Sequence, residues 1–293
     1  MISAIVPTFR GASRLARNLP SVRTSLEAAG ETWEVVVVDD GGGDVGPLPE
    51  GARLVTLVEN GGYGPAVNAG VAQARGGHLL VLNDDVRLEE ATVGRLRRQF
   101  PGPGLFAAVP AVRSSLAACG DEGGKAGVLV GGLIEIREAP SAETHPTLYP
   151  VGCCFLCPRA AYLDLGGFDD CYAPFFWEDV DLGYRAWQRG LRVLHVPEAV
   201  CHHEGSATLS EQRTLEERER IGFRNRVLFH LRNVQAPALR ARCLGALTAF
   251  ALFEARAERL AGLGEAVALF RKLGPRREQG LTDGEILDRV AGA

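Results

Sequence analysis

Two adjacent carboxylates follow a short apolar run in the first third of the chain, where Asn83-Asp84-Asp85 comes directly after Leu79–Leu82. Neighbouring carboxylates repel each other, so they persist in such a place when a cation or hydrogen-bond donors compensate. Hard divalent cations such as Mg²⁺ favour one or two carboxylates together with substrate phosphate oxygens. The triplet therefore favours a site for a metal ion and a diphosphate, although Asn and Asp are also common turn residues.

A second acidic pair, Asp39-Asp40, ends another apolar run and is followed by Gly41-Gly42-Gly43. Glycines let a ligand approach the backbone closely. A carboxylate at this position can accept a hydrogen bond from a nucleobase N–H or a ribose hydroxyl. A strand-to-loop turn explains the same residues. A phosphate loop is the weaker interpretation, because neither the Walker pattern nor Gly-x-Gly-x-x-Gly opens a helix here.

The third candidate is the aromatic and acidic triplet Trp177-Glu178-Asp179. A carboxylate beside bulky aromatic rings loses contact with water, which raises its pKa toward the range of a general base. Two successive acids can also divide the work, with one removing a proton and the other orienting an acceptor. The same acids would stabilise the N-terminus of a helix, and this explanation is compatible with a function.

Histidines and cysteines supply further candidate ligands. His202 and His203 are adjacent in a chain with six histidines, which favours a ligand as much as a structural role. Cys154 and Cys157 have the spacing of a redox or zinc pair, but they lie in the apolar run 151–157 and no second pair follows. We therefore expect them to be core residues, in a chain whose seven cysteines are reduced.

The elements that must position these residues are alternating strands and helices, the pattern of a parallel sheet with right-handed crossovers. In such sheets the ligand lies beyond the carboxyl ends of the strands. Pro7-Thr8, Asp39-Asp40 and Asp84-Asp85 all fall at strand ends. The predicted elements are strands at 3–6 (ended by Pro7), 34–38, 53–58 and 79–82, and helices at 13–29 (with Ser13 as N-cap) and 65–74.

The remaining chain is less regular until it reaches a charged, helical tail. The tail either packs on the rest of the protein, forms a dimer interface or lies on an anionic membrane, and packing is the simplest of these. The predicted elements are a buried strand at 151–157, a helix at 182–189, a strand at 192–196, a helical segment at 211–226 and, after a break at Pro237, one or two helices at 238–272.

Length, charge and composition narrow the class of protein. The 293 residues, 46% of them hydrophobic, suffice for one large α/β domain or two closely packed halves. The net charge of −4 argues against a nucleic-acid partner, because neutralising phosphates needs a basic face. The first residues lack a signal-peptide pattern and no apolar run is long enough to span a bilayer. We therefore expect a cytoplasmic protein, either free or peripheral at the inner face of the membrane.

Taken together, these features resemble the family 2 glycosyltransferases of the GT-A fold, in particular the rhamnosyltransferase-like branch. The matching segments occur in the family's order, and the ordered set is far more specific than any one motif. They are Ile5–Arg10, Val36–Gly41, Glu59–Gly70, Leu80–Asp85, Gly166–Asp169, Trp177–Leu182 and His203–Thr208. Two details depart from the family: Asn83 replaces the first acid of its Asp-x-Asp motif, and Gly41–Gly43 replace its usual Gly/Asn-Ser.

The resemblance implies an α/β fold, with a Rossmann-like, mainly parallel central sheet flanked by helices and a C-terminal helical extension. Residues 1–110 would form the nucleotide-sugar-binding half of one domain. Residues 111–210 would form its acceptor-binding and catalytic half, and residues 211–293 would form the extension.

The resemblance also assigns roles to individual residues. Those at the donor nucleotide-sugar are Pro7, Thr8 and Asp40 at the nucleobase and ribose, supported by Asp39, then Asn60, Gly62 and Asn68 in the diphosphate-sugar pocket, and Asp84 at the ribose or donor sugar. The ligands of a Mn²⁺ or Mg²⁺ ion would be Asp85 and His203, with His202 as the alternative. Asp179 would be the catalytic base, with Trp177 and Glu178 at the acceptor.

The implied function is transfer of a sugar from a nucleoside-diphosphate sugar to an acceptor hydroxyl with inversion, in cell-surface polysaccharide or glycolipid synthesis. UDP- or dTDP-sugars are favoured because a carboxylate suits the N3–H of uracil or thymine, although it suits guanine too. The acceptor would be a saccharide or a lipid-linked molecule. One alternative is a nucleotidyltransferase, but residues 6–11 offer little of the phosphate loop that such an enzyme needs. The other is an inactive sugar-nucleotide-binding protein, and the joint presence of Asp85, Asp179 and His203 argues against it.

Overall fold

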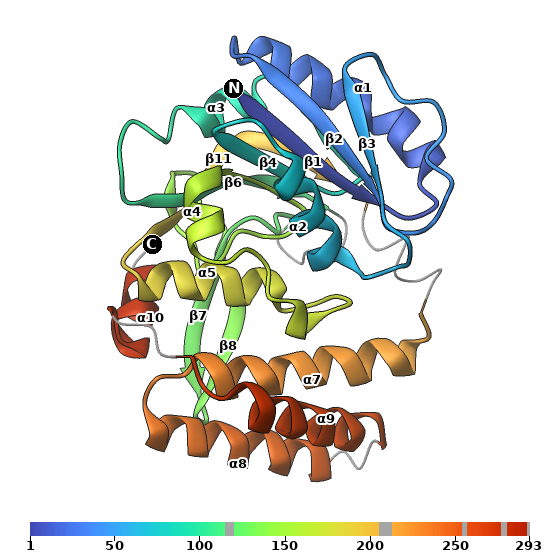
Figure 1. The fold of residues 1–293 in the computed structure, drawn as a ribbon. Coiled ribbons are helices and arrows are strands. Elements are labelled where there is room, and N and C mark those ends of the chain that lie inside the picture. The colour runs from blue at the N-terminus through green and yellow to red at the C-terminus, as the bar shows by residue number, and fades with distance from the viewer. Residues whose placement is uncertain (115–119, 205–212, 254–256, 277–279, 292–293) are drawn as a thin grey trace.

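A twisted, nine-stranded mixed sheet forms the centre of the computed structural model, which describes residues 1–291 apart from 115–119, 205–212, 254–256 and 277–279 (Figure 1). Its strand order is β3-β2-β1-β4-β10-β6-β11-β5, and β9 pairs with β11. The strands are β1 (Ile2–Thr8), β2 (Trp33–Asp39), β3 (Ala52–Thr56), β4 (His78–Leu82), β5 (Val86–Leu88), β6 (Leu105–Arg113), β9 (His145–Pro146), β10 (Cys154–Pro158) and β11 (Arg192–His203).

The first four strands are all parallel, as the alternating pattern predicts. Helix α1 (Ala12–Ala28) connects β1 to β2, and α2 (Tyr63–Gln73) connects β3 to β4. These two connections run in opposite directions along the sheet, so right-handed crossovers place the two helices on opposite faces. Both helices and all four strands were predicted within a few residues of their observed bounds.

Two local predictions in this half were wrong. Ser13 is not the N-cap of α1, because Gly11 occupies that position and no side chain caps the helix. Pro7 does not end β1, since the strand continues to Thr8. Proline is tolerated there because β1 pairs with β4 only from Ile2 to Ile5, which leaves no partner on that side for the missing N–H.

The second half of the sheet mixes directions. Strand β10 is antiparallel to β4 and β6, whereas β11 runs parallel to β6 and antiparallel to β5. Cys154 and Cys157 lie fully buried in β10, as predicted, although the strand begins later than expected. Strand β11 extends well beyond the predicted 192–196, and its last residue is His203. The sheet is therefore mainly parallel and flanked by helices, as expected.

Helix α5 (Glu178–Gln188) lies between the sheet and the C-terminal helices (Figure 1). The other elements are α3 (Thr92–Arg97), α4 (Arg159–Asp164), the 3₁₀ turn η1 (Asp170–Tyr172), the hairpin β7 (Lys125–Val130) and β8 (Leu133–Glu138), α7 (Leu215–Asn233), α8 (Pro237–Phe253), α9 (Ala257–Leu273) and α10 (Asp283–Ala291).

The C-terminal tail forms helices, as predicted. Helix α7 begins after a capping box formed by Thr214 and Glu217, later than the predicted start at 211, which lies outside the described residues. Pro237 starts α8 rather than simply breaking the chain, and the tail beyond it forms two long helices and a shorter one. Among the residues that the structure describes, no helix is long and apolar enough to cross a membrane.

Candidate functional site

A cavity of about 320 Å³ opens beyond the carboxyl ends of β1, β2 and β4. Segments from distant parts of the sequence line it, including the loop before β10, the start of α5 and the end of β11. The predicted site residues that line the cavity are Pro7, Thr8, Asp40, Asn60, Gly62, Asp84, Asp85, Glu178, Asp179 and His203. Asp39, Asn68 and Trp177 do not line it.

The buried carboxylate of Asp84 is held by protein donors. The Thr8 hydroxyl donates to its Oδ2 at 2.5 Å, and Arg14 Nε donates to its Oδ1 at 3.0 Å. Asn18 of α1 donates to its backbone oxygen at 3.0 Å. Burial raises the pKa of Asp84, and the hydrogen bonds from Arg14 and Thr8 oppose that shift. Asp84 therefore fixes the β4 terminus against β1 and α1, which orients its neighbour Asp85.

The Asp39–Asp40 pair organises two loops at the end of β2. Asp40 accepts from the backbone N–H groups of Gly61 and Gly62 at 2.8 and 2.9 Å, one on each carboxylate oxygen. Asp39 accepts from the N–H groups of Gly42 and Gly43 at 2.8 and 3.0 Å. Both carboxylates thus shape the backbone around the cavity, and Asp40 also faces into it.

Gly62 cannot be replaced without moving the cavity wall. Its φ is +92°, a conformation that favours glycine. A Cβ atom there would lie 2.3 Å from the carbonyl oxygen of Pro174. That carbonyl accepts from the N–H of Tyr63 at 2.9 Å, which ties the start of α2 to the segment before Trp177.

His203 lies between two carboxylates. Its Nε2 is 3.4 Å from Asp85 Oδ1, and its Nδ1 is 3.5 Å from Glu122 Oε2. Burial lowers the pKa of His203, but these two carboxylates outweigh it and raise that pKa to about 9. The two ion pairs are the contacts of Asp85 Oδ1 and His203 Nδ1, which are buried and make no hydrogen bond of good geometry within the described chain. Such polar atoms need a partner, and a divalent cation between a carboxylate and an imidazole would supply one.

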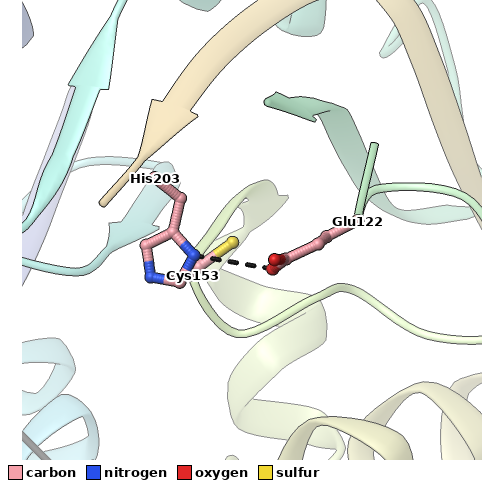
Figure 2. Close-up of side chains that lie close together, drawn as sticks. All are labelled: Glu122, Cys153 and His203. Atoms are coloured by element: carbon pink, nitrogen blue, oxygen red, sulfur yellow. Dashed lines mark ion pairs between the residues drawn. The ribbon is translucent and has the colours of Figure 1, made fainter. Parts of the chain in front are cut away.

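Cys153 and Glu122 lie beside His203 as well, and no sequence motif marks either of them. One ligand atom from each of Glu122, Cys153 and His203 lies within 4.8 Å of the others (Figure 2). His202, the alternative ligand, instead lies with its Nε2 3.3 Å from Glu89 and does not line the cavity. The structure therefore brings His203, and not His202, to Asp85.

Glu178 and Asp179 lie at the first turn of α5, where acids stabilise the helix N-terminus. Asp179 Oδ2 accepts from the Gly152 N–H at 3.0 Å, and its Oδ1 accepts from the Val180 N–H at 2.8 Å. Burial raises its pKa, and these hydrogen bonds oppose the shift. Burial and the charge of Asp179 raise the pKa of Glu178 well above its ordinary value, and its buried Oε2 has no hydrogen-bond partner.

Two predicted site residues have structural contacts instead. The Asn68 side chain donates to the Phe168 carbonyl and accepts from the Tyr162 hydroxyl, both at 2.8 Å, and so fastens α2 to the segment before η1. Trp177 has a left-handed backbone and packs its ring against Phe229 of α7. Tyr63 was not predicted as a site residue, yet it lines the cavity and donates a hydrogen bond to the Gly152 carbonyl.

The comparison with protein families decides the class. The family model described as "Glycosyl transferase family 2" matches residues 3–166. The chain belongs to this family. The match covers the cavity walls from β1 through β10, and the chain is therefore a glycosyltransferase enzyme with the GT-A fold, as the resemblance implied.

Two curated relatives support the expected branch. The N-acetylglucosaminyl-diphospho-decaprenol L-rhamnosyltransferase of Mycobacterium tuberculosis is 27% identical over 244 residues, which are 71% of this chain and 78% of the relative. The succinoglycan biosynthesis protein ExoO of Rhizobium meliloti is 35% identical over 105 residues, 34% of this chain and 28% of ExoO. The chain thus matches less than a third of ExoO.

Solved structures share the fold at low identity. GalNAc-T7 with UDP, GalNAc and Mn²⁺ superposes with a TM-score of 0.60 at 16% identity, covering 94% of this chain and 57% of that one. TarS of S. aureus with UDP-GlcNAc has a TM-score of 0.59 at 18% identity, covering 94% and 81%. The mannosyltransferase PcManGT of Pyrobaculum calidifontis, with GDP-Man and Mn²⁺, has a TM-score of 0.51 at 16% identity, covering 92% and 87%. These likenesses show the fold alone.

Proposed function

We propose that this glycosyltransferase moves a sugar from a nucleoside-diphosphate sugar to an acceptor hydroxyl with inversion at the anomeric carbon. The observation that carries the proposal is one cavity lined by Asp85 and His203, which suit a metal ion, and by Asp179, which suits a base. Residues 1–110 would supply the donor-binding half of the domain and residues 111–210 the acceptor-binding half.

The donor would lie along the ends of β1, β2 and β4. Pro7 and Thr8 would contact the nucleoside, and Asp40 and the loop that it holds, with Asn60 and Gly62, would meet the ribose and diphosphate. Asp84 accepts hydrogen bonds from Thr8 and Arg14, and it would therefore hold Thr8 in position rather than bind the donor itself. A UDP- or dTDP-sugar is favoured, and the structural neighbours were solved with UDP, UDP-GlcNAc and GDP-Man.

A divalent cation fits the residues present. Asp85 and His203 offer a carboxylate and an imidazole whose contact with each other is a long ion pair, and the carboxylate suits Mn²⁺ or Mg²⁺. When bound, the cation would neutralise the charge that develops on the diphosphate leaving group. Because the leaving group is then stabilised without a proton, the protein needs no general acid at that end.

Asp179 would act on the acceptor hydroxyl, on the opposite side of the anomeric carbon from the diphosphate. Its carboxylate would remove the proton from the acceptor hydroxyl as the oxygen attacks the anomeric carbon and the bond to the diphosphate breaks. A single displacement inverts the anomeric centre. Glu178, with its raised pKa and unpartnered Oε2, would donate a hydrogen bond to the acceptor. Trp177 would support both acids by anchoring the start of α5 against α7.

The acceptor is proposed to be a saccharide or lipid-linked molecule, met at an anionic membrane surface through α8 and α9. These two helices lie beneath α7, away from the sheet (Figure 1). Their most exposed charged residues, within the described chain, are Arg242, Arg271 and Lys272, whereas Glu258 and Glu265 of α9 are half-buried. Leu252 and Phe253 are 60% and 91% exposed on the same helices. Exposed basic side chains and exposed apolar side chains on one pair of helices suit an anionic lipid surface.

Vesicle sedimentation tests the membrane surface. We expect the full chain to bind phosphatidylglycerol vesicles and not phosphatidylcholine ones. Phe253→Glu should abolish binding, whereas Val58→Glu, a matched change at another exposed apolar residue, should not. A concentration-dependent dimer that Phe253→Glu dissociates, with no vesicle binding, would assign this face to a second copy of the chain instead.

A panel of nucleotide-sugars tests the catalytic proposal. The correct donor should raise the melting temperature with Mn²⁺, release nucleoside diphosphate when acceptor is added, and give a product of inverted anomeric configuration by NMR. EDTA should suppress the release. Release of pyrophosphate from a nucleoside triphosphate would support a nucleotidyltransferase, and donor binding without turnover for any acceptor would support an inactive binding protein.

A further inference from the structure

The Cys153 thiol is placed differently from the other cysteines of its segment. Cys154 and Cys157 are fully buried in β10. Cys153 precedes that strand and lines the same cavity as Asp85 and His203. Its sulfur lies within 4.8 Å of both a His203 ring nitrogen and a Glu122 carboxylate oxygen (Figure 2). A thiol that only filled the core would not need to face these two polar groups.

The three residues come from segments that are far apart in the sequence. Glu122 follows β6, Cys153 precedes β10 and His203 ends β11. Because β6 lies between β10 and β11, the sheet brings these three strand ends together. The His203 side chain is nine-tenths buried, and its Nδ1, which faces Glu122, has no hydrogen bond. The sheet therefore holds an imidazole, a carboxylate and a thiol together, and only a long ion pair occupies the His203 Nδ1.

The two nitrogens of His203 have different neighbours. Nδ1 faces Glu122, and Nε2 faces Asp85. A histidine that binds a metal through one nitrogen commonly donates its other N–H to a carboxylate. Each nitrogen of His203 has such a carboxylate available. The ring can thus bind a cation on either side while the opposite carboxylate holds its orientation.

The donor chemistry selects among cations. Mg²⁺ prefers an octahedral set of oxygen ligands and retains several waters. A thiolate, an imidazole and a carboxylate are instead the ligand types that bind Zn²⁺, and Co²⁺ accepts the same set. Asp85 and His203 alone would leave Mg²⁺ and Mn²⁺ as reasonable occupants. The thiol beside Glu122 and His203 shifts the preference toward softer ions.

We propose that Cys153 and Glu122 join His203 as ligands of the divalent cation, so that the site prefers Zn²⁺ and Co²⁺ to Mg²⁺. This inference rests on the metal-assisted function proposed above, and it places the cation on the Nδ1 side of His203, where Asp85 holds Nε2 and does not itself bind the cation. On binding, the Cys153 thiol loses its proton to solvent and its sulfur donates an electron pair to the cation.

Cobalt spectroscopy on the full, EDTA-stripped chain tests the ligand directly. We expect Co²⁺ to produce a near-ultraviolet thiolate-to-cobalt charge-transfer band in the wild type. Cys153→Ser should lose the band, and Cys157→Ser, a matched change at a buried cysteine outside the group, should keep it. Calorimetric competition should show the ratio of Zn²⁺ to Mg²⁺ affinity falling by about tenfold or more in Cys153→Ser, since even supporting groups around a metal contribute that much.

The outcomes separate the two proposals. Equal cobalt spectra in the wild type and Cys153→Ser would overturn the thiolate ligand and leave the metal-assisted function standing. Calorimetry that detects no cation binding in the wild type, with or without nucleoside diphosphate, would overturn both. Cys153→Ala replaces Cys153→Ser if the buried hydroxyl prevents folding, and Glu122→Gln should weaken Co²⁺ binding in the same titration.

Discussion

Replacing Asp40 by asparagine should weaken the donor site by disturbing the loop that forms its wall. In the wild type each carboxylate oxygen accepts one backbone N–H, from Gly61 at 2.8 Å and from Gly62 at 2.9 Å. Asparagine keeps one accepting oxygen but points an NH₂ group at the other N–H. One charge-assisted hydrogen bond is lost, and the two donors then face each other.

The size of the effect follows from two opposing contributions. A hydrogen bond to a charged group contributes about 1.5–3 kcal/mol. Burial raises the pKa of Asp40, so removing its charge recovers part of that loss. We expect a net destabilisation of about 1–2 kcal/mol. If binding must restore the wild-type loop conformation at the same free-energy cost, affinity for the nucleoside diphosphate should fall about tenfold.

Urea denaturation and isothermal titration with nucleoside diphosphate measure the two quantities. Asp44→Asn is the matched control, because Asp44 is an exposed aspartate in the loop after the same strand. It should leave stability and affinity unchanged. If Asp40→Asn were as stable as the wild type and bound the nucleotide equally well, Asp40 would not hold the loop in the manner described.

Two further predictions concern other carboxylates. Glu178→Gln should retain most transfer activity, because a glutamine side chain can donate the same hydrogen bond as a protonated Glu178. Glu178→Ala should instead raise the KM for the acceptor. Steady-state kinetics that show an equal loss in both variants would contradict a neutral Glu178. Hydrogen bonding from Cys171 and the charges of Arg276 and Arg232 lower the pKa of Asp169 despite its burial. Its stabilising effect is therefore fully present above an unfolded pKa of about 3.9 and declines as pH falls from there through the lower folded pKa, so Asp169→Asn should destabilise the protein by about 2 kcal/mol at pH 7. Urea midpoints that stayed equally separated at pH 3 would contradict this.

The parallel half of the fold was predictable because strands and helices alternate with clear periodicity, and because polar residues gather where strands end. The direction of β10 was not, since its apolar run fits a buried strand of either direction. The start of α1 was misread because Gly11 and Ser13 both suit an N-cap, and only the backbone decides between them.

Site residues that lie in recognisable motifs were predictable, whereas site residues that are brought together only by neighbouring strands were not. Asp85, Asp179 and His203 lie in recognisable segments and meet in one cavity. Glu122 lies in an irregular loop, and only the neighbouring positions of β6 and β11 bring it to His203. Asn68 has a polar side chain in a motif, yet its partners Phe168 and Tyr162 show a structural contact that the sequence alone does not reveal.

Asp179→Asn tests the central claim most directly. The substitution keeps the size of the side chain and removes its ability to accept a proton. We predict that transfer falls by about 10³-fold or more, while calorimetry shows donor affinity close to that of the wild type. A variant whose donor affinity collapses together with its transfer rate would contradict the assignment of Asp179 as the base.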